Sequence, residues 1–220
     1  MEKNTFPAVA NTDGAIVYVI DDDASLRSSL SSLLRSCGYS VRTFEGTRDF
    51  ISAEKPGVPS CLLLDVRLQG ESGLTFQLSA RRHQVDMPII VMTAHGDIEM
   101  SVEAMKAGAI DFLTKPVREQ RVIDAVSSAI GRHAEQLEKS LTRVSLMARY
   151  DTLTVREREV IWYVVKGFLN KQIAAEMNLS EITIKMYRGA AMKKLEALSL
   201  PDLIRKTDII KGCVSTKQEW

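Results

Sequence analysis

The 220-residue sequence lacks any apolar run of the roughly eighteen or more residues that a membrane-spanning helix needs. Its first residues contain no basic segment followed by an apolar core, so we expect no secretory signal, no membrane contact and a cytoplasmic location. The three cysteines, Cys37, Cys61 and Cys213, lie far apart without a Cys-x-x-Cys pair. This spacing argues against a disulfide framework or a zinc site.

Length and charge indicate two domains of different character. A chain of 220 residues is long for one compact domain and comfortable for two. Residues 1–117 contain 11 basic and 15 acidic side chains, residues 118–150 contain 6 and 4, and residues 151–220 contain 12 and 9. An acidic first half and a basic second half favour nucleic-acid binding for the second half alone.

Short β-branched runs alternate with amphipathic stretches in the first half of the chain. Strands are predicted at Ile16–Ile20, Ser40–Phe44, Cys61–Leu64, Ile89–Met92 and Asp111–Leu113. Helices are predicted at Ser25–Ser36, Thr47–Ser52, Ser72–Arg82 and Asp97–Ala107, with a further one from about Arg118. Five consecutive βα units predict an α/β domain with a doubly wound, five-stranded parallel sheet.

The next segment, from Arg118 to about Arg149, is helix-compatible and free of proline. Apolar residues recur there every seven positions, at Ile123, Ile130, Leu137 and Val144. One interpretation is a half-exposed connecting helix. The other is a dimer seam, although polar residues interrupt the companion row of the heptads.

After Tyr150 the pattern becomes all-helical. Thr154 is a candidate N-cap, with Glu157 three residues later completing a capping box. Further helices are predicted at Asn170–Met177, from the Ser180 cap to about Leu198, and in a short segment from Pro201, leaving Gly212–Trp220 as a tail. Four helices in this length are enough for a small all-α domain.

Polar side chains follow four of the predicted strands. Asp21 and Asp22 follow the first, Asp65 the third, Thr93 the fourth and Lys115 the fifth. In doubly wound sheets ligands bind beyond the carboxyl ends of the strands, so these groups should converge. Taken one by one, such residues are usually solvent-facing loop residues. Together they predict a phosphoryl-transfer site, in which clustered carboxylates hold Mg²⁺, Asp65 attacks phosphorus, and Lys115 and Thr93 receive the phosphate.

Residues 16 to about 130 resemble the receiver domains of response regulators, because VIDDD, LLLDVRL, VMTAHG and FLTKPV occur in that family's order. The resemblance implies a flavodoxin-like sheet with the strand order 2-1-3-4-5. It also implies that Asp65 is the phosphoacceptor. Asp21 and Asp22 would hold Mg²⁺, together with Asp65 and the backbone carbonyl of Arg67.

The same resemblance assigns the remaining site residues. Thr93 and Lys115 would hold the phosphoryl group, Thr93 and Phe112 would form the switch, and the Lys115–Pro116 bond would be cis. Gln69 and Glu71 depart from the family pattern in the loop after Asp65. In that family, the side chains at the positions of Arg67 and His95 tune how fast the phosphate is lost.

The segment NKQIAAEMNLSEITIKMYRGAAMKKL has the spacing of a helix-turn-helix. LTVREREV, GFLNKQIA and SEITIKMY also resemble the LuxR-type family, which implies a recognition helix from Glu181. The implied DNA contacts are Lys171, Lys185, Met186, Arg188, Gly189, Lys193 and Lys194. Tyr187, Gly189 and Ala190 depart from the family pattern, which leaves the DNA sequence open.

The expected division is a flexible tail at 1–14, a receiver at 15–130, a linker helix at 131–150 continuing the last receiver helix, the helix-turn-helix domain at 151–211 and a tail at 212–220. A receiver followed by a LuxR-type domain is the arrangement of the FixJ/NarL family of response regulators. It implies a non-enzymatic regulator, phosphorylated by a sensor histidine kinase, that dimerises on phosphorylation and binds double-stranded promoter DNA beside RNA polymerase. Two alternatives stay open: a constitutive DNA-binding regulator with a non-signalling receiver, and a hydrolytic or phosphotransfer enzyme using the carboxylate site.

Overall fold

The computed structural model describes residues 14–94 and 98–214 of the chain. By its internal contacts the chain divides into two compact units, Met1–Leu137 and Glu138–Trp220, and each is described by itself. The predictions for the N-terminal tail and for His95 fall on residues outside the described ranges, apart from Gly14. No described helix combines the length and the apolar character required to cross a membrane.

The first unit is built on a parallel sheet of five strands in the order β2-β1-β3-β6-β7. The strands are β1 (Ile16–Ile20), β2 (Ser40–Phe44), β3 (Ser60–Asp65), β6 (Ile89–Thr93) and β7 (Asp111–Thr114). The predicted fold and strand order are therefore confirmed, with three strands one residue longer at the carboxyl end than expected. β1 and β3 are buried along their whole length, as expected for central strands covered on both faces.

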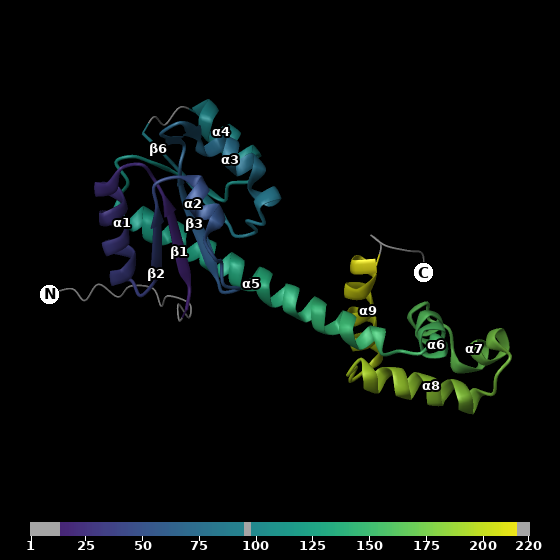
Figure 1. Ribbon diagram of the computed structural model, residues 1–220. Helices are drawn as coiled ribbons and strands as arrows, with labels where there is room; N and C mark the ends of the chain where they lie inside the picture. Colours follow the sequence, from purple (N-terminus) through teal and green to yellow (C-terminus); the bar gives the residue numbers. More distant parts are fainter. Residues whose placement is uncertain (1–13, 95–97, 215–220) are drawn as a thin grey trace. The chain divides into compact units, whose positions relative to one another are not determined.

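Helices cover both faces of this sheet (Figure 1). On one face α1 (Ala24–Ser36) and the first part of α5 (Glu119–Asp151) pack against alternate strand residues such as Val17, Val19 and Leu63. On the other face α2 (Thr47–Ser52), α3 (Gly73–Ser79) and α4 (Ile98–Lys106) cover the intervening residues, including Tyr18 and Leu62. The period-two alternation of each strand thus supplies two separate cores.

The loop after Asp65 contains structure that the sequence did not predict. β4 (Arg67–Leu68) and β5 (Glu71–Ser72) form a short antiparallel pair joined through Gly70, whose φ is 80°. Consequently α3 begins at Gly73 instead of Ser72. It also ends early, because a 3-10 turn, η1 (Ala80–His83), replaces its last residues.

The helix α5 is continuous over 33 residues, from Glu119 to Asp151. Val122, Ala125, Val126, Ala129 and Ile130 bury its first part in the sheet core. Farther along, Leu141 and Val144 are 71% and 66% exposed, so the connecting helix has an apolar stripe that is open to solvent. Its use as a dimer seam stays a prediction.

The second unit is all-helical, with α6 (Val155–Val165), α7 (Asn170–Met177), α8 (Glu181–Lys194) and α9 (Leu200–Val214). The predicted capping box is confirmed: Thr154 and Glu157 exchange side-chain to main-chain hydrogen bonds. The core of this unit includes the buried residues Ile173, Ala174, Ile184, Ala191 and Leu195, and Met177, Leu179 and Tyr187 pack against it.

Two helix limits differ from the prediction. α8 ends at Lys194 rather than near Leu198, because Glu196 adopts a left-handed φ of 50° that cannot continue a helix. α9 is not short: it begins at Leu200 and runs to Val214, into the predicted tail. Leu203 and Ile210 from this helix are fully buried, so tertiary packing supports its extra turns.

Candidate functional site

The four polar groups predicted at strand ends converge at the carboxyl edge of the sheet. Asp21 follows β1, Asp65 and Thr93 are the last residues of β3 and β6, and Lys115 follows β7. Because β1, β3, β6 and β7 are parallel neighbours, their carboxyl ends meet at one edge. The prediction that these residues converge at one edge of the sheet is therefore correct.

Lys115 connects the two buried carboxylates. Its Nζ lies 2.7 Å from Oδ2 of Asp21 and 2.6 Å from Oδ2 of Asp65. Its main-chain N–H donates to the carbonyl of Thr93 over 2.7 Å, and the following bond to Pro116 is cis, as predicted. The ammonium group is thus held between two carboxylates from different strands.

Two residues of this cluster, Asp21 and Lys115, have raised pKa values. Burial raises the pKa of Asp21, although hydrogen bonds and the charge of Lys115 oppose the rise. Burial alone would lower the pKa of Lys115, but its hydrogen bonds to Asp21 and Asp65 and their charges outweigh this effect and raise it. Lys115 therefore stays positively charged at neutral pH.

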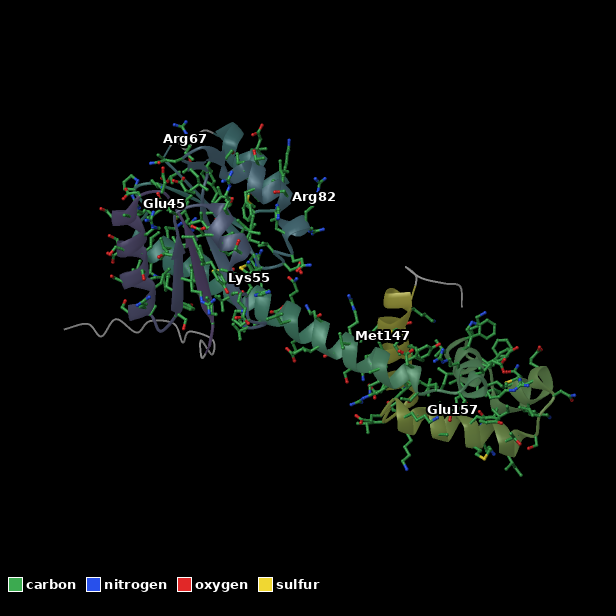
Figure 2. All side chains as sticks on the ribbon, in the orientation of Figure 1. Glu45, Lys55, Arg67, Arg82, Met147 and Glu157 are labelled. Carbon is green, nitrogen blue, oxygen red and sulfur yellow. The ribbon has the colours of Figure 1, made fainter. Side chains whose placement is uncertain are left out.

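The same residues offer a site for a divalent cation. One carboxylate oxygen from each of Asp21, Asp22 and Asp65 lies within 4.8 Å of the others. Hard oxygen donors at this spacing fit Mg²⁺, which binds one or more carboxylates and keeps several of its waters. The main-chain N–H of Arg67 donates to Oδ1 of Asp65 over 3.2 Å, so the loop that carries the Arg67 carbonyl turns back over the site. The side chain of Arg67 is exposed (Figure 2).

The two predicted switch residues lie near the cluster in different environments. Thr93 is fully buried at the end of β6. Phe112 in β7 is half-buried and packs at the margin of the core beneath α2, α3 and α4.

Gly73, the first residue of α3, also belongs to this site, although it was not predicted from the sequence. A Cβ atom at this position would lie 2.0 Å from the main-chain oxygen of Asp65, far inside van der Waals contact. The main-chain N–H of Gly73 also donates to the carbonyl of Val66 over 2.9 Å. Only a glycine lets α3 approach the end of β3 this closely, and a lone glycine in a loop gave no signal of that contact.

Sequence reasoning also missed Arg27, on the first turn of α1. Its Nη1 atom donates to the main-chain carbonyl of Asp21 over 2.6 Å. The acidic turn is further ordered by Asp23, whose main-chain N–H donates to Oδ1 of Asp21 over 3.0 Å. The spacing of six residues between Asp21 and Arg27 places the guanidinium back over the turn.

The predicted DNA contacts are all on α7 and α8. Lys171, Lys185, Met186, Gly189 and Lys193 are exposed, and no atom lies within 4 Å of a Cβ added at Gly189. Arg188 is half-buried and its Nη1 lies 3.3 Å from Oδ1 of Asn170, a contact between α8 and α7.

Lys194, the last residue of α8, forms an ion pair with a buried carboxylate of the same domain. Its Nζ lies 2.7 Å from Oε2 of Glu157 and donates to the carbonyl of Thr152 over 3.1 Å. Glu157 is buried at the start of α6 (Figure 2). Although burial opposes the shift, the hydrogen bonds from Lys194 and Thr154 lower the pKa of Glu157. This ion pair joins the end of the predicted recognition helix to the start of α6.

Comparison with known proteins agrees with both halves of the structure. Residues 17–127 match the response regulator receiver domain, and residues 151–207 match the luxR family of bacterial regulatory proteins. Nodulation protein W of Bradyrhizobium diazoefficiens is 48% identical over 196 residues, covering 89% of this chain and 86% of that protein. The transcriptional regulatory protein FixJ of the same species is 42% identical over 191 residues, covering 86% of this chain and 92% of that protein.

The solved structures give the same result. The response regulator StyR is similar with a TM-score of 0.78 and 40% sequence identity, covering 88% of this chain and 98% of that one. Matches over both domains, together with the carboxylate cluster, distinguish the chain from proteins that share only one of the two folds. The chain therefore belongs to the two-component response regulators that join a receiver domain to a LuxR-type DNA-binding domain, the family of FixJ.

Proposed function

We propose that Asp65 accepts a phosphoryl group from the phosphohistidine of a sensor histidine kinase. A carboxylate oxygen of Asp65 attacks phosphorus, the P–N bond breaks, and the imidazole leaves with its electron pair and takes a proton. The observation that supports this role is the convergence of Asp65 with Lys115 at 2.6 Å and with two further carboxylates within 4.8 Å. Outside this phosphorylation cycle the protein acts as a regulator and not as an enzyme.

Mg²⁺ is the cofactor that we assign to Asp21, Asp22, Asp65 and the backbone carbonyl of Arg67. When bound, it would neutralise the negative charge that builds up where phosphorus is transferred. Lys115 is already placed to offset the negative charge of a phosphoryl group on Asp65. The hydroxyl of Thr93 would donate a hydrogen bond to that group.

Phosphorylation of Asp65 would then change the receiver surface that includes α4 and β7. Movement of Thr93 toward the phosphoryl group would let Phe112 turn inward, which favours a pre-existing alternative state of the receiver. The segment from Asp97 to Leu113 is the surface that we assign to homodimerisation. Val102 and Met105 on α4 are 44% and 48% exposed there, so an apolar surface is available.

The DNA-binding half would read promoter DNA with α8. We assign Lys185, Met186 and Gly189 to the major groove, and the remaining predicted contacts, Lys171, Arg188, Lys193 and Lys194, to phosphates. Lys194 would have to leave Glu157 to do so. A dimer would place two recognition helices on a two-fold site, beside RNA polymerase and in the cytoplasm, where kinase, ATP and DNA occur together. The domain limits expected from the sequence, 15–130 and 151–211, stay predictions.

The phosphoacceptor assignment is tested with acetyl phosphate, MgCl₂ and the intact protein. Wild type should gain one phosphoryl group by mass spectrometry, while Asp65→Asn should gain none. Asp86→Asn is the matched control, because Asp86 is an exposed carboxylate that precedes β6 at the opposite edge of the sheet. Equal labelling of wild type and Asp65→Asn would refute the assignment.

The DNA assignment is tested by fluorescence anisotropy with a duplex selected from a random pool. Phosphorylated protein should bind more tightly and as a dimer. Lys171→Met, which removes an assigned phosphate contact, should weaken binding and reduce the slope of log affinity against log salt by about one. Affinity that does not depend on phosphorylation would instead indicate a constitutive regulator.

A further inference from the structure

The turn that carries the two acidic residues is held by main-chain contacts on several sides. The main-chain N–H of Asp21 donates to the carbonyl of Phe44 over 3.2 Å, which ties the turn to β2. Oδ1 of Asp23 accepts from the main-chain N–H groups of Ser25 and Leu26 at 2.8 and 3.2 Å, which caps α1. A further contact is the 2.6 Å hydrogen bond from Nη1 of Arg27 to the carbonyl of Asp21.

Arg27 donates to a main-chain carbonyl of the acidic turn and not to one of its carboxylates. A guanidinium beside several carboxylates usually forms a bidentate pair with one of them. Here the described hydrogen bond of Arg27 goes to a backbone carbonyl, while the ion pairs of Asp21 and Asp65 are made with Lys115. Arg27 thus orders the main chain of the acidic turn without occupying the oxygens that face a cation.

A positive charge at this place would have two opposite effects on a divalent cation. Through space it repels the cation, so removing it should tighten binding slightly. Through its hydrogen bond it holds Asp21 and Asp22 in the converging arrangement, so removing it should weaken binding, because the turn would have to be ordered when the cation binds. The sign of the change in cation affinity when Arg27 is replaced therefore shows which of the two effects is larger.

We propose that Arg27 is a positioning residue for the divalent-cation site of this receiver. Its guanidinium fixes the carbonyl of Asp21 and thereby sets the direction of the carboxylates on either side of the Asp21–Asp22 peptide bond. The inference rests on the proposed function only in taking Asp21, Asp22 and Asp65 as the cation site.

The experiment measures Mn²⁺ binding to the full chain by electron paramagnetic resonance, which counts free Mn²⁺ and needs no phosphorylation. Arg27→Met removes the donor and the charge but keeps most of the aliphatic stem. Arg27→Lys keeps a charged donor on a shorter side chain. Arg35→Met is the matched control, since Arg35 lies on the same helix and donates to the carbonyl of Val41 over 3.3 Å at the end remote from the site.

We expect Arg27→Met to weaken Mn²⁺ binding about tenfold, as expected for loss of a hydrogen bond from a charged donor. Arg27→Lys should recover part of this loss, and Arg35→Met should change the affinity by less than about twofold. In acetyl phosphate labelling, Arg27→Met should need correspondingly more MgCl₂ for half-maximal rate, with the rate at saturating MgCl₂ close to that of wild type.

Unchanged or tighter Mn²⁺ binding in Arg27→Met would overturn the proposal, as would an equal loss in Arg35→Met. If circular dichroism shows that Arg27→Met does not fold, Arg27→Lys tests the proposal instead. Wild-type Mn²⁺ affinity in Arg27→Lys would then overturn it. Failure of wild type to be labelled on Asp65 is a separate result. It would refute the phosphoacceptor assignment and leave the Mn²⁺ comparison valid.

Discussion

The main-chain N–H of Ser60, the first residue of β3, donates a hydrogen bond of 2.9 Å to Nδ1 of His133 on α5. His133 is buried, 6% exposed, and lies three residues beyond the expected limit of the receiver. Asp65 is the last residue of the same strand. One strand therefore joins Asp65, the proposed phosphoacceptor, to the helix that continues toward the DNA-binding half of the chain.

Acidification should weaken the receiver through His133. Burial lowers the pKa of His133, although the nearby charge of Asp86 opposes this, and only the neutral ring can accept from Ser60. With the pKa lower in the folded state, the stabilisation is present at neutral pH. It is lost as pH falls from the unfolded value of about 6.5 through the folded pKa. Calorimetry of the full chain should show the receiver transition moving to lower temperature between pH 7.5 and pH 5.5.

The matched variant is His133→Asn, because Oδ1 of asparagine can accept where Nδ1 does but does not titrate in this range. Its receiver transition should move less with pH than that of wild type. His133→Ala should lose about 1–3 kcal/mol at neutral pH by leaving the Ser60 N–H unpaired. Both tryptophans, Trp162 and Trp220, lie in the second half, so fluorescence identifies the other transition. An equal pH dependence in His133→Asn and wild type would contradict this role.

Gly73→Ala should destabilise the receiver by about 1–3 kcal/mol, because the new methyl group would meet the main-chain oxygen of Asp65. It should also slow acetyl phosphate labelling, since the end of β3 must shift. Gly131→Ala is the opposite case: Gly131 lies inside α5 with nothing within 4 Å of an added Cβ. This change should stabilise by up to about 1 kcal/mol. Urea unfolding followed by circular dichroism measures the stability of both variants. Equal changes in stability would contradict the close contact between Gly73 and the main-chain oxygen of Asp65.

Lys194→Met should destabilise the helical domain by about 1–3 kcal/mol, because it leaves the buried carboxylate of Glu157 without its cation. Lys193→Met, on the exposed neighbouring position, should change stability by no more than about 0.5 kcal/mol. Urea unfolding followed by tryptophan fluorescence provides the measurement. If Lys193→Met reduces the salt dependence of DNA binding and Lys194→Met does not, Lys194 has a structural role. If Lys194→Met leaves the free energy of unfolding unchanged, the ion pair with Glu157 does not stabilise the domain.

Asp21→Asn should stabilise the metal-free receiver at neutral pH and abolish its stabilisation by Mg²⁺. Burial raises the pKa of Asp21, so the ionised carboxylate is penalised in the folded state and a neutral amide relieves that penalty. In wild type, MgCl₂ at about one hundred times its dissociation constant should add about 2.7 kcal/mol. Calorimetry with and without MgCl₂ tests both parts. An Asp21→Asn protein that still gains stability from Mg²⁺ would argue against Asp21 as a ligand.

The βα order, the strand limits to within a residue, and the convergence of Asp21, Asp65, Thr93 and Lys115 could all be predicted from the sequence. These features depend on periodicity and on the rule that parallel strands present their carboxyl ends at one edge, which are local or topological properties. The capping box of Thr154 and Glu157 was likewise predictable, because its partners are three residues apart.

The contacts between residues of different elements could not be predicted from the sequence and became known from the fold. The contacts of Gly73 with Asp65, of Lys194 with Glu157 and of His133 with Ser60 join residues from different elements. Composition and spacing carry no information about such pairs, because they depend on side-chain reach and helix placement after packing. For the same reason the length of α9 came from burial of Leu203 and Ile210, and not from its local helix signals.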